Sequence, residues 1–235
     1  MKKINVIKTD YQFNIELGND FDTLMEGAVI FTPWNEVKSK MTFERISEQK
    51  AFEWYSKLSG YVMGVRRDGT ILIPQVIIND PATKTAGAVD ILAVRPDGSL
   101  QIIDLKTSIN SINDSAYNGS GFPITYGSEF YVTDDSTLDK NGDPIPSAQM
   151  KMNTRMQHSL QVGTYRRILQ NMGYRVYSLD NSENRSETWH INVEVDTKTD
   201  KEGNIISQTF KDAVFEGQNN YAPSENIKEI NKLVP

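Results

Sequence analysis

The stretch Gly87-Ala-Val-Asp-Ile-Leu-Ala-Val-Arg-Pro-Asp-Gly-Ser-Leu-Gln-Ile-Ile-Asp-Leu-Lys-Thr-Ser108 reads as two apolar strands joined by a tight turn. At its centre, Arg95-Pro-Asp-Gly98 has proline at the second turn position and glycine where a left-handed residue is needed. This combination favours a type I turn closed by a glycine bulge, a common three-residue hairpin loop. We therefore expect a β-hairpin in which Arg95 pairs with Ser99.

The register of this hairpin decides which charged side chains lie together. Counting back from the turn places Asp90 opposite Asp104, so that both carboxylates share one face of the sheet, and Lys106 shares it two residues further on. A two-residue turn at Asp97-Gly98 would instead shift the register by one residue and move Asp90 to the other face. Pro96 fits the first position of the longer loop, which favours the register with Asp90 opposite Asp104.

Asp90 and Asp104 are both embedded in apolar strands, where a charge is costly unless something binds it. Two carboxylates on one face also repel each other unless a cation lies between them. Asp-x-Lys alone is a common sequence, and a hairpin with solvated charges is the ordinary alternative. The paired acids favour a metal site instead.

The series Gly-x-x-Asp, hairpin, Ile-x-Asp-x-Lys-Thr resembles the core of the PD-(D/E)XK nucleases, in the branch of RecB-type and phage lambda-type exonucleases. Downstream, Gln161-Val-Gly-Thr-Tyr165 resembles the Gln-x-x-x-Tyr helix of RecB-type nucleases. The resemblance runs from about Glu44 to Val195. It implies an α/β fold with a restriction-endonuclease-like core, in which helices flank a central mixed β-sheet.

An upstream helix is expected from Phe43 to Gly60, where this nuclease branch carries a metal-site glutamate. Helical spacing places Glu44 within the apolar arc and Glu48 at its edge, whereas Glu53 falls on the opposite side. Chemistry alone leaves Glu44 or Glu48, and an amphipathic surface helix with a boundary glutamate is the alternative. The resemblance selects Glu48, because an alanine and a Ser-Gly pair follow it at the lambda-type spacing.

A downstream helix is expected from about residue 151 to residue 172, ending at glycine. Its face carries Gln161 and Tyr165, which either pack as satisfied core residues or lie against the strand of Asp104 and Lys106, where they orient these residues or touch the scissile phosphate. Arg155 and Arg166 flank this face and are candidate DNA contacts, together with Thr107 of the hairpin motif. A solvated helix face is the alternative for the two arginines.

These residues together predict phosphodiester hydrolysis. Asp90, Asp104 and Glu48 would bind Mg²⁺ or Mn²⁺, since hard cations prefer carboxylate oxygens, and the resemblance adds the backbone carbonyl of Leu105. The metal would lower the pKa of a bound water, and Lys106 would position that water and offset charge on the phosphorus.

Composition sets further bounds. The chain has 235 residues, 38% of them apolar, which is enough for one α/β core. It has no cysteine, which excludes disulfides, thiolate zinc sites and the iron–sulfur cluster of several RecB-type relatives. No P-loop and no membrane-length apolar run appear, so we expect a cytoplasmic bacterial or phage protein whose helicase motor, if any, is another chain. The net charge of −6 argues against tight non-specific DNA binding and favours partner-assisted action.

The chain is expected to form a single domain, 1–235. We expect N-terminal strands in 1–32, the core in about 40–195 with a strand at 71–78, and a C-terminal hairpin and tail in 189–235. Residues 109–150 form a long insertion after the catalytic strand, either a structural hairpin or a flap that offers aromatic side chains to DNA bases. Those aromatic side chains are Tyr117, Phe122, Tyr126, Phe130 and Tyr131.

The leading hypothesis is a Mg²⁺-dependent, exonuclease-like DNA nuclease of recombination, repair or phage DNA processing, acting on DNA with a recombination or helicase partner. The alternatives are a catalytically retired nuclease fold that serves as a scaffold, and a structure-specific endonuclease.

Overall fold

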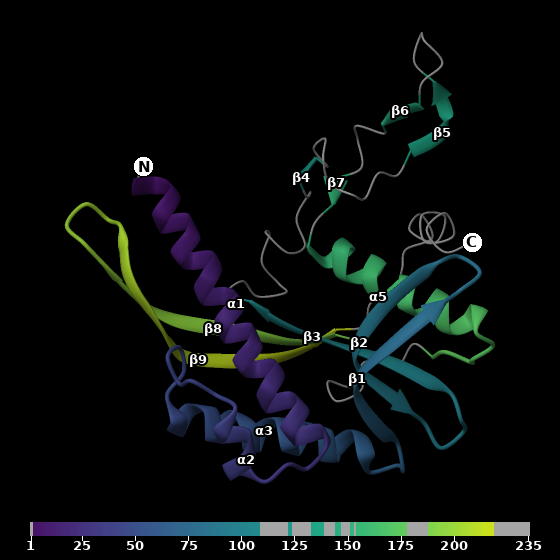
Figure 1. Ribbon diagram of the computed structural model, residues 1–235, viewed down its shortest axis with the longest axis horizontal. Coiled ribbons are helices and arrows are strands. Elements are labelled where there is room, and N and C mark those ends of the chain that lie inside the picture. The colour runs from purple at the N-terminus through teal and green to yellow at the C-terminus, as the bar shows by residue number, and fades with distance from the viewer. Residues whose placement is uncertain are drawn as a thin grey trace.

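The computed structural model describes residues 2–108, 122–123, 133–138, 144–146, 151–152, 154–177 and 188–218, with side chains in 13–108, 158, 161–177 and 188–216. Within these ranges the chain is an α/β protein built on a five-stranded mixed sheet (Figure 1). None of the described helices combines the length and apolar character needed to cross a lipid bilayer.

The sheet has the strand order β1-β2-β3-β8-β9. Neighbouring strands are antiparallel except for β3 and β8, which are parallel. The strands are β1 (Ile71–Asp80), β2 (Thr85–Val94), β3 (Leu100–Ser108), β8 (Thr188–Thr199) and β9 (Ile205–Gln218). The parallel pair places a late segment of the chain beside the strand that carries Asp104 and Lys106.

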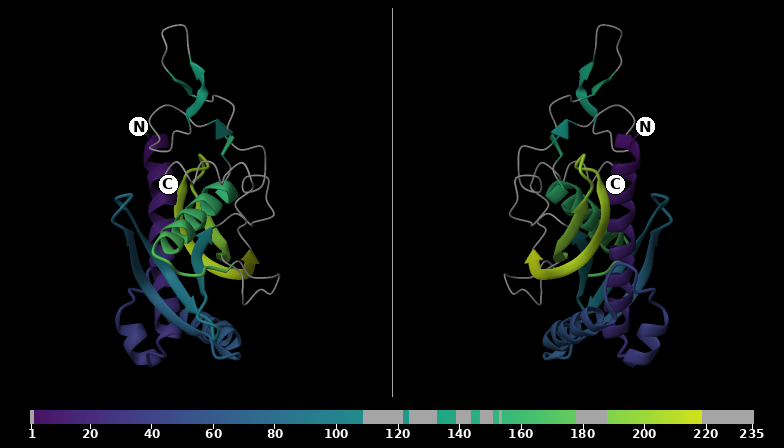
Figure 2. Two further views of the ribbon diagram at one scale, coloured as in Figure 1. Left: turned by 90° about the vertical axis from the view of Figure 1, so that its right-hand side faces the viewer. Right: turned by 90° about the vertical axis from the view of Figure 1, so that its left-hand side faces the viewer.

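Helices cover both faces of the sheet (Figures 1 and 2). Three helices, α1 (Lys2–Val29), α2 (Trp34–Ser39) and α3 (Glu48–Arg66), pack with one face into a large apolar core. The helix α5 (Thr154–Asn171) packs on the other face with a smaller apolar cluster, called the α5 cluster, which includes Val89, Val162 and Leu169. Residues 102 and 103 of β3 contribute to opposite sides, Ile102 to the α5 cluster and Ile103 to the large core.

The N-terminal segment forms the helix α1, so the expectation of strands in 1–32 was wrong. Its buried side chains recur every three or four residues, at Phe13, Leu17, Phe21, Leu24 and Ala28. That period is helical and presents one stripe to the core, where the Phe21 ring meets Trp54 of α3 edge-on at 5.4 Å. The helical stripe outweighs the local alternation of apolar and polar residues before Phe13.

The two helices expected from sequence are present with shifted ends. α3 begins later than expected, because Ser47 caps it by accepting a hydrogen bond from the Lys50 N–H at 3.3 Å, and it continues to Arg66. Phe43 has a φ of 59° and lies outside the helix. α5 ends as expected before Gly173, whose φ of 89° is the left-handed conformation that ends many helices.

The strand expected at 71–78 is confirmed and extends to Asp80 as β1. The C-terminal hairpin is also confirmed, and its turn is closed by the Asp200 N–H donating to the Asn204 carbonyl at 2.9 Å.

The expected insertion, 109–150, contains the short strands β4, β5 and β6 in its described parts, and β7 follows directly after it. β4 (Phe122–Pro123) pairs with β7 (Lys151–Met152), and β5 (Thr133–Leu138) pairs with β6 (Pro144–Pro146). Phe122 lies in β4, whereas Tyr117, Tyr126, Phe130 and Tyr131 lie outside the described residues.

Candidate active site

The β2–β3 hairpin has the register predicted from its turn. The Arg95 N–H donates to the Ser99 carbonyl at 2.9 Å, and Gly98 has a φ of 77°. The ladder then runs back to the Ile91–Ile103 pair, which is the pairing that places Asp90 and Asp104 at equivalent positions. The bulged loop is therefore confirmed over the two-residue alternative.

Asp90 and Asp104 lie at the point where β2 and β3 separate. β3 turns to β8 as its neighbour from Asp104 onward, while β2 continues beside β1. At this fork the Asp90 carboxylate replaces a lost ladder partner, since its Oδ2 accepts a hydrogen bond from the Leu105 N–H at 2.8 Å. The carbonyl of Leu105 lies along the same edge of β3 as its N–H and so faces the fork.

Asp104 is buried, with 1% of its surface exposed, and it is held by Lys106. The Lys106 Nζ lies 3.1 Å from Oδ1 and 2.9 Å from Oδ2 of Asp104. Burial raises the pKa of Asp104 to about 6, Lys106 opposes this, and the charges of Asp90 and Asp22 add to it. Burial lowers the pKa of Lys106, but Asp104 and Asp90 outweigh it, so that the net shift is upward and the amine is an ammonium.

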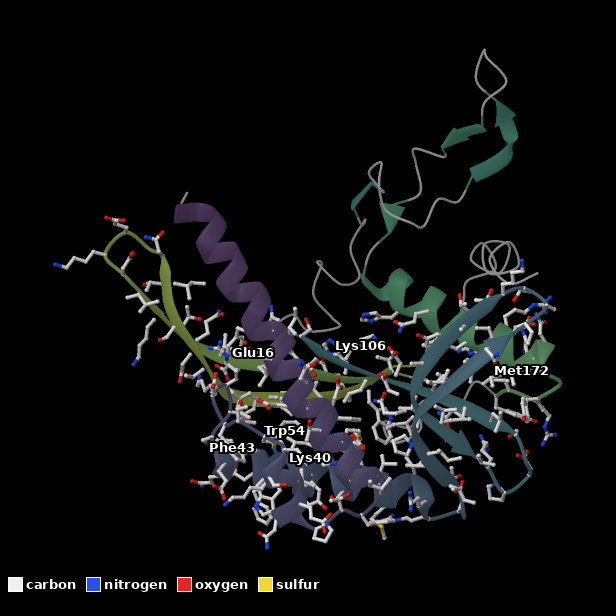
Figure 3. All side chains as sticks on the ribbon, in the orientation of Figure 1. Glu16, Lys40, Phe43, Trp54, Lys106 and Met172 are labelled. Carbon is white, nitrogen blue, oxygen red and sulfur yellow. The ribbon has the colours of Figure 1, made fainter. Side chains whose placement is uncertain are left out.

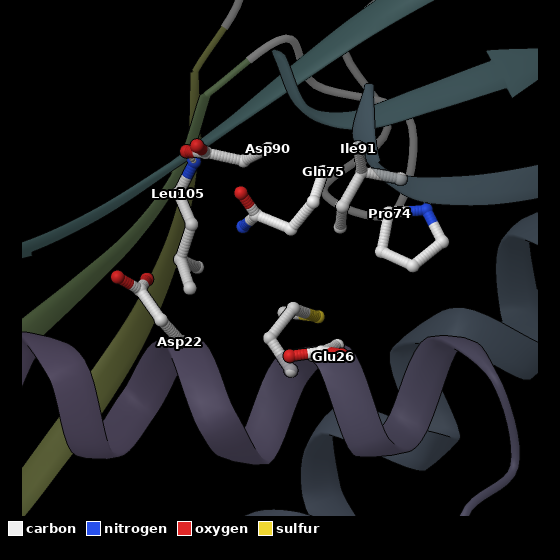
Figure 4. Close-up of a pocket in the computed structure, with 8 residues that line it drawn as sticks. Asp22, Glu26, Pro74, Gln75, Asp90, Ile91 and Leu105 are labelled. Atoms are coloured by element: carbon white, nitrogen blue, oxygen red, sulfur yellow. Dashed lines mark hydrogen bonds between the residues drawn. The ribbon is translucent and has the colours of Figure 1, made fainter. Parts of the chain in front are cut away.

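The helix α1 brings two further acids to the fork, Asp22 and Glu26. Four residues apart, they share one side of the helix and line a small pocket with Gln75, Asp90 and Leu105 (Figure 4). Asp22 projects from α1 toward Asp90 and Leu105. The Asp22 side chain is exposed by its surface area, but its carboxylate is surrounded by protein on the side of the fork; this desolvation and then the charge of Asp90 raise its pKa to about 6, against the effect of Lys106.

The backbone around Asp90 is irregular. Gln75, its neighbour on β1, has a φ of 52° and interrupts the β1–β2 ladder between Pro74 and Val76. Left-handed backbone at a non-glycine residue is strained, and such strain clusters at functional sites. Across the ladder, the regular alternation of side chains on β2 breaks at Asp90, since Val89 packs in the α5 cluster while Ile91, two residues on, packs in the large core.

The helix α5 places Gln161 and Tyr165 on the Lys106 side of the sheet, as expected. The Gln161 Nε2 donates to the Tyr165 hydroxyl at 3.1 Å, and the Tyr165 ring packs against the α5 cluster. The phenol also helps to raise the pKa of Lys106. His158, one turn earlier, is near enough to Lys106 that burial and then this ammonium lower its pKa to about 3. Figure 3 shows Lys106 between α1 and α5.

Glu48 does not join the aspartates, so the expectation that it completes the site was wrong. It is the exposed first residue of α3, forms an ion pair with Lys38, and lines a surface hollow with Trp34 and Phe52. The buried stripe of α3 faces α1, and α1 occupies the place beside Asp90. Among the side chains described, no three Asp, Glu, His or Cys groups are arranged to hold a metal ion.

The candidate DNA contacts Thr107 and Arg166 lie on β3 and α5. Thr107 is half-buried on β3, in register with Ile191 of β8. Arg166 is half-buried on α5, whereas the Arg155 side chain lies outside the described residues. Sequence reasoning missed Asp22 and Glu26. Their signal was an i, i+4 pair of acids beside the helical stripe of Phe21 and its neighbours, which is readable once the segment is recognised as a helix.

Comparisons of the chain with protein-family models, with curated proteins and with solved structures found no match.

Proposed function

We propose that the chain is a metal-dependent DNA nuclease that hydrolyses phosphodiester bonds, with exonuclease-like action, on a restriction-endonuclease-like core of the PD-(D/E)XK type. One observation carries the proposal. Asp90, Asp104 and Lys106 meet where two sheet strands separate, and Asp104 is a buried carboxylate whose pKa stays raised to about 6, chiefly by burial, despite its lysine partner.

The side chains at the fork fit a divalent cation chemically. Asp22, Asp90 and Asp104 place three mutually repelling carboxylates around the Lys106 ammonium, which leaves negative charge in excess. Hard oxygen ligands of this kind suit Mg²⁺ or Mn²⁺. Asp90 and Asp104 would hold the ion, with the Leu105 carbonyl at the same edge. Asp22, rather than Glu48, would add a third negative charge beside the ion without being arranged as a third ligand.

A bound divalent ion supplies a water of lowered pKa and stabilises the leaving oxyanion. The Lys106 ammonium is held at the fork by Asp104, on the side of the sheet that α5 covers. There it would donate hydrogen bonds to the attacking water and offset charge developing on the phosphate. Gln161 and Tyr165 form one hydrogen-bonded unit, and Tyr165 is near enough to Lys106 to act on its charge, so the unit would orient the ammonium.

The negative net charge of the chain limits how strongly it can bind DNA. A net charge of −6 opposes a DNA backbone at long range, so affinity depends on the ion at the fork and on local bases such as Arg166. Such a nuclease acts with a recombination or helicase partner that delivers DNA, in recombination, repair or phage DNA processing.

The test is incubation of the protein with Mg²⁺ and end-labelled linear or circular DNA, with EDTA as the metal-free arm. We expect linear DNA to be degraded with Mg²⁺, and Asp104→Asn or Lys106→Met to lose activity while they remain folded. Asp196→Asn, an exposed aspartate of β8, is the matched control and retains activity.

Cleavage of circular DNA identifies an endonuclease on the same core. A folded wild-type protein that cuts neither DNA in Mg²⁺ or Mn²⁺ contradicts the proposal and favours the scaffold alternative.

A further inference from the structure

Gly87 lies on β2, three residues before Asp90, and the ring of Tyr165 lies directly against it. A Cβ at Gly87 would be 2.3 Å from Cε1, 2.9 Å from Cδ1 and 3.2 Å from Cζ of Tyr165. Carbon atoms in contact prefer separations of about 3.5–4.0 Å. Any residue other than glycine at this position must therefore push the Tyr165 ring away from β2.

The backbone itself does not call for glycine at this position. The glycines with positive φ in the described chain are Gly69, Gly98, Gly173 and Gly203. Gly87 is not among them, so an alanine could adopt its backbone conformation without strain. The requirement at residue 87 comes from the tyrosine ring.

The Tyr165 ring is also confined on its other sides. It packs against the apolar cluster that includes Val89 and Val162, and its hydroxyl accepts a hydrogen bond from the Gln161 Nε2 at 3.1 Å. A ring held in this way cannot shift without moving the Gln161–Tyr165 pair.

We propose that Gly87 is a positioning residue of this site, whose bare backbone seats the Tyr165 ring and so sets the Gln161–Tyr165 pair relative to Lys106. This rests on the proposed nuclease function. Gly87 and Asp90 lie on the same strand, so the contact between Gly87 and Tyr165 sets the position of α5 relative to Asp90. The glycine of the Gly-x-x-Asp motif would then be required for steric reasons.

The test is a double-mutant cycle of Gly87→Ala and Tyr165→Ala, read by Tm without metal and by kcat and KM on linear DNA with Mg²⁺. Gly60→Ala is the matched control, because a Cβ there meets no atom within 4 Å. We expect Gly87→Ala to lower Tm and to lower kcat by about tenfold, with the same split between kcat and KM as Tyr165→Ala. In the Tyr165→Ala background, Gly87→Ala changes neither Tm nor kcat, and Gly60→Ala retains kcat.

The inference is overturned if the effects of Gly87→Ala and Tyr165→Ala add in the double variant, whether in Tm or in kcat. It is also overturned if Gly87→Ala has the kcat of the wild type. If Gly87→Ala fails to fold, the double variant must fold and match Tyr165→Ala in Tm, and its failure to do so also overturns the inference. An inactive wild-type protein contradicts the proposed function instead, and the Tm cycle then still decides whether Gly87 seats the ring.

Discussion

Removing Lys106 tests the charge arrangement at the fork most directly, because Lys106 is the cation that contacts the buried Asp104. Lys106→Met keeps the length and apolar stem of the side chain but deletes the ammonium. Asp104 would then be a buried carboxylate still repelled by Asp90 and Asp22. We expect the free energy of unfolding to fall, and to fall more at higher pH.

The size of the loss follows from the distances. Opposite unit charges about 3 Å apart attract by about 5 kcal/mol at an effective dielectric constant near 20. The Lys106 side chain is 25% exposed, so solvent screens part of this attraction. We expect a loss of about 3 kcal/mol at pH 8, near the lower end of the range for breaking a buried ion pair.

The sign of the pH dependence comes from Asp104. Its pKa of about 6 in the folded protein exceeds its ordinary value, so its ionisation favours the unfolded state as the pH rises through 6. At pH 5 the carboxyl is mostly protonated and Lys106 has little charge to neutralise. The loss caused by Lys106→Met there should be below about 1 kcal/mol.

Urea denaturation in EDTA at pH 5 and pH 8 measures both values. The double variant Asp104→Asn/Lys106→Met, which removes both charges, should recover most of the stability at pH 8. Equal losses at the two pH values, or no recovery in the double variant, would refute the assignment of a buried Asp104–Lys106 pair.

Three further predictions concern the acids. Millimolar Mg²⁺ should raise Tm by about 5 °C at pH 8 and much less at pH 5, and Asp104→Asn should abolish the shift, as differential scanning fluorimetry will show. Asp22→Asn should lower the rate of Mg²⁺-dependent DNA cleavage by about tenfold whereas Glu48→Gln changes it by less than about twofold; the reverse ranking would restore Glu48 to the site. Burial and the neighbouring Glu16 raise the pKa of Asp20 to about 6, against the opposing effect of Arg45. In urea denaturation, Asp20→Asn should therefore stabilise the protein by about 1 kcal/mol at pH 8 and by nothing at pH 4. Equal stability of variant and wild type at pH 8 would contradict this.

The hairpin could be predicted from sequence because its geometry is local. Proline at residue 96 and glycine at residue 98 select one loop, and that loop determines the pairing of every residue behind it. This register brings Asp90 and Asp104 to equivalent positions, and the separation of the two strands there, which the sequence did not indicate, turns the Asp90 carboxylate to the Leu105 N–H. The Gln161–Tyr165 unit was also readable, since two residues one helical turn apart face the same way.

The third acid depends on contacts between distant segments and was therefore missed. Nothing within α3 shows that its buried stripe faces α1 rather than the fork, and this packing turns Glu48 toward Lys38 and solvent. Asp22 reaches Asp90 because α1 crosses the sheet at this point, an arrangement set by the large core. The parallel pairing of β3 with β8, separated by a long segment, was likewise beyond local patterns.

The hydrogen bond from the Leu105 N–H to Asp90 makes this amide proton a natural reporter of what happens to the carboxylate. An ion that draws electron density from Asp90 weakens the acceptor of this hydrogen bond, so the chemical shift of the Leu105 amide proton should move when the ion is added. Occupancy could thus be followed in a single backbone signal, without substrate and without any mutation.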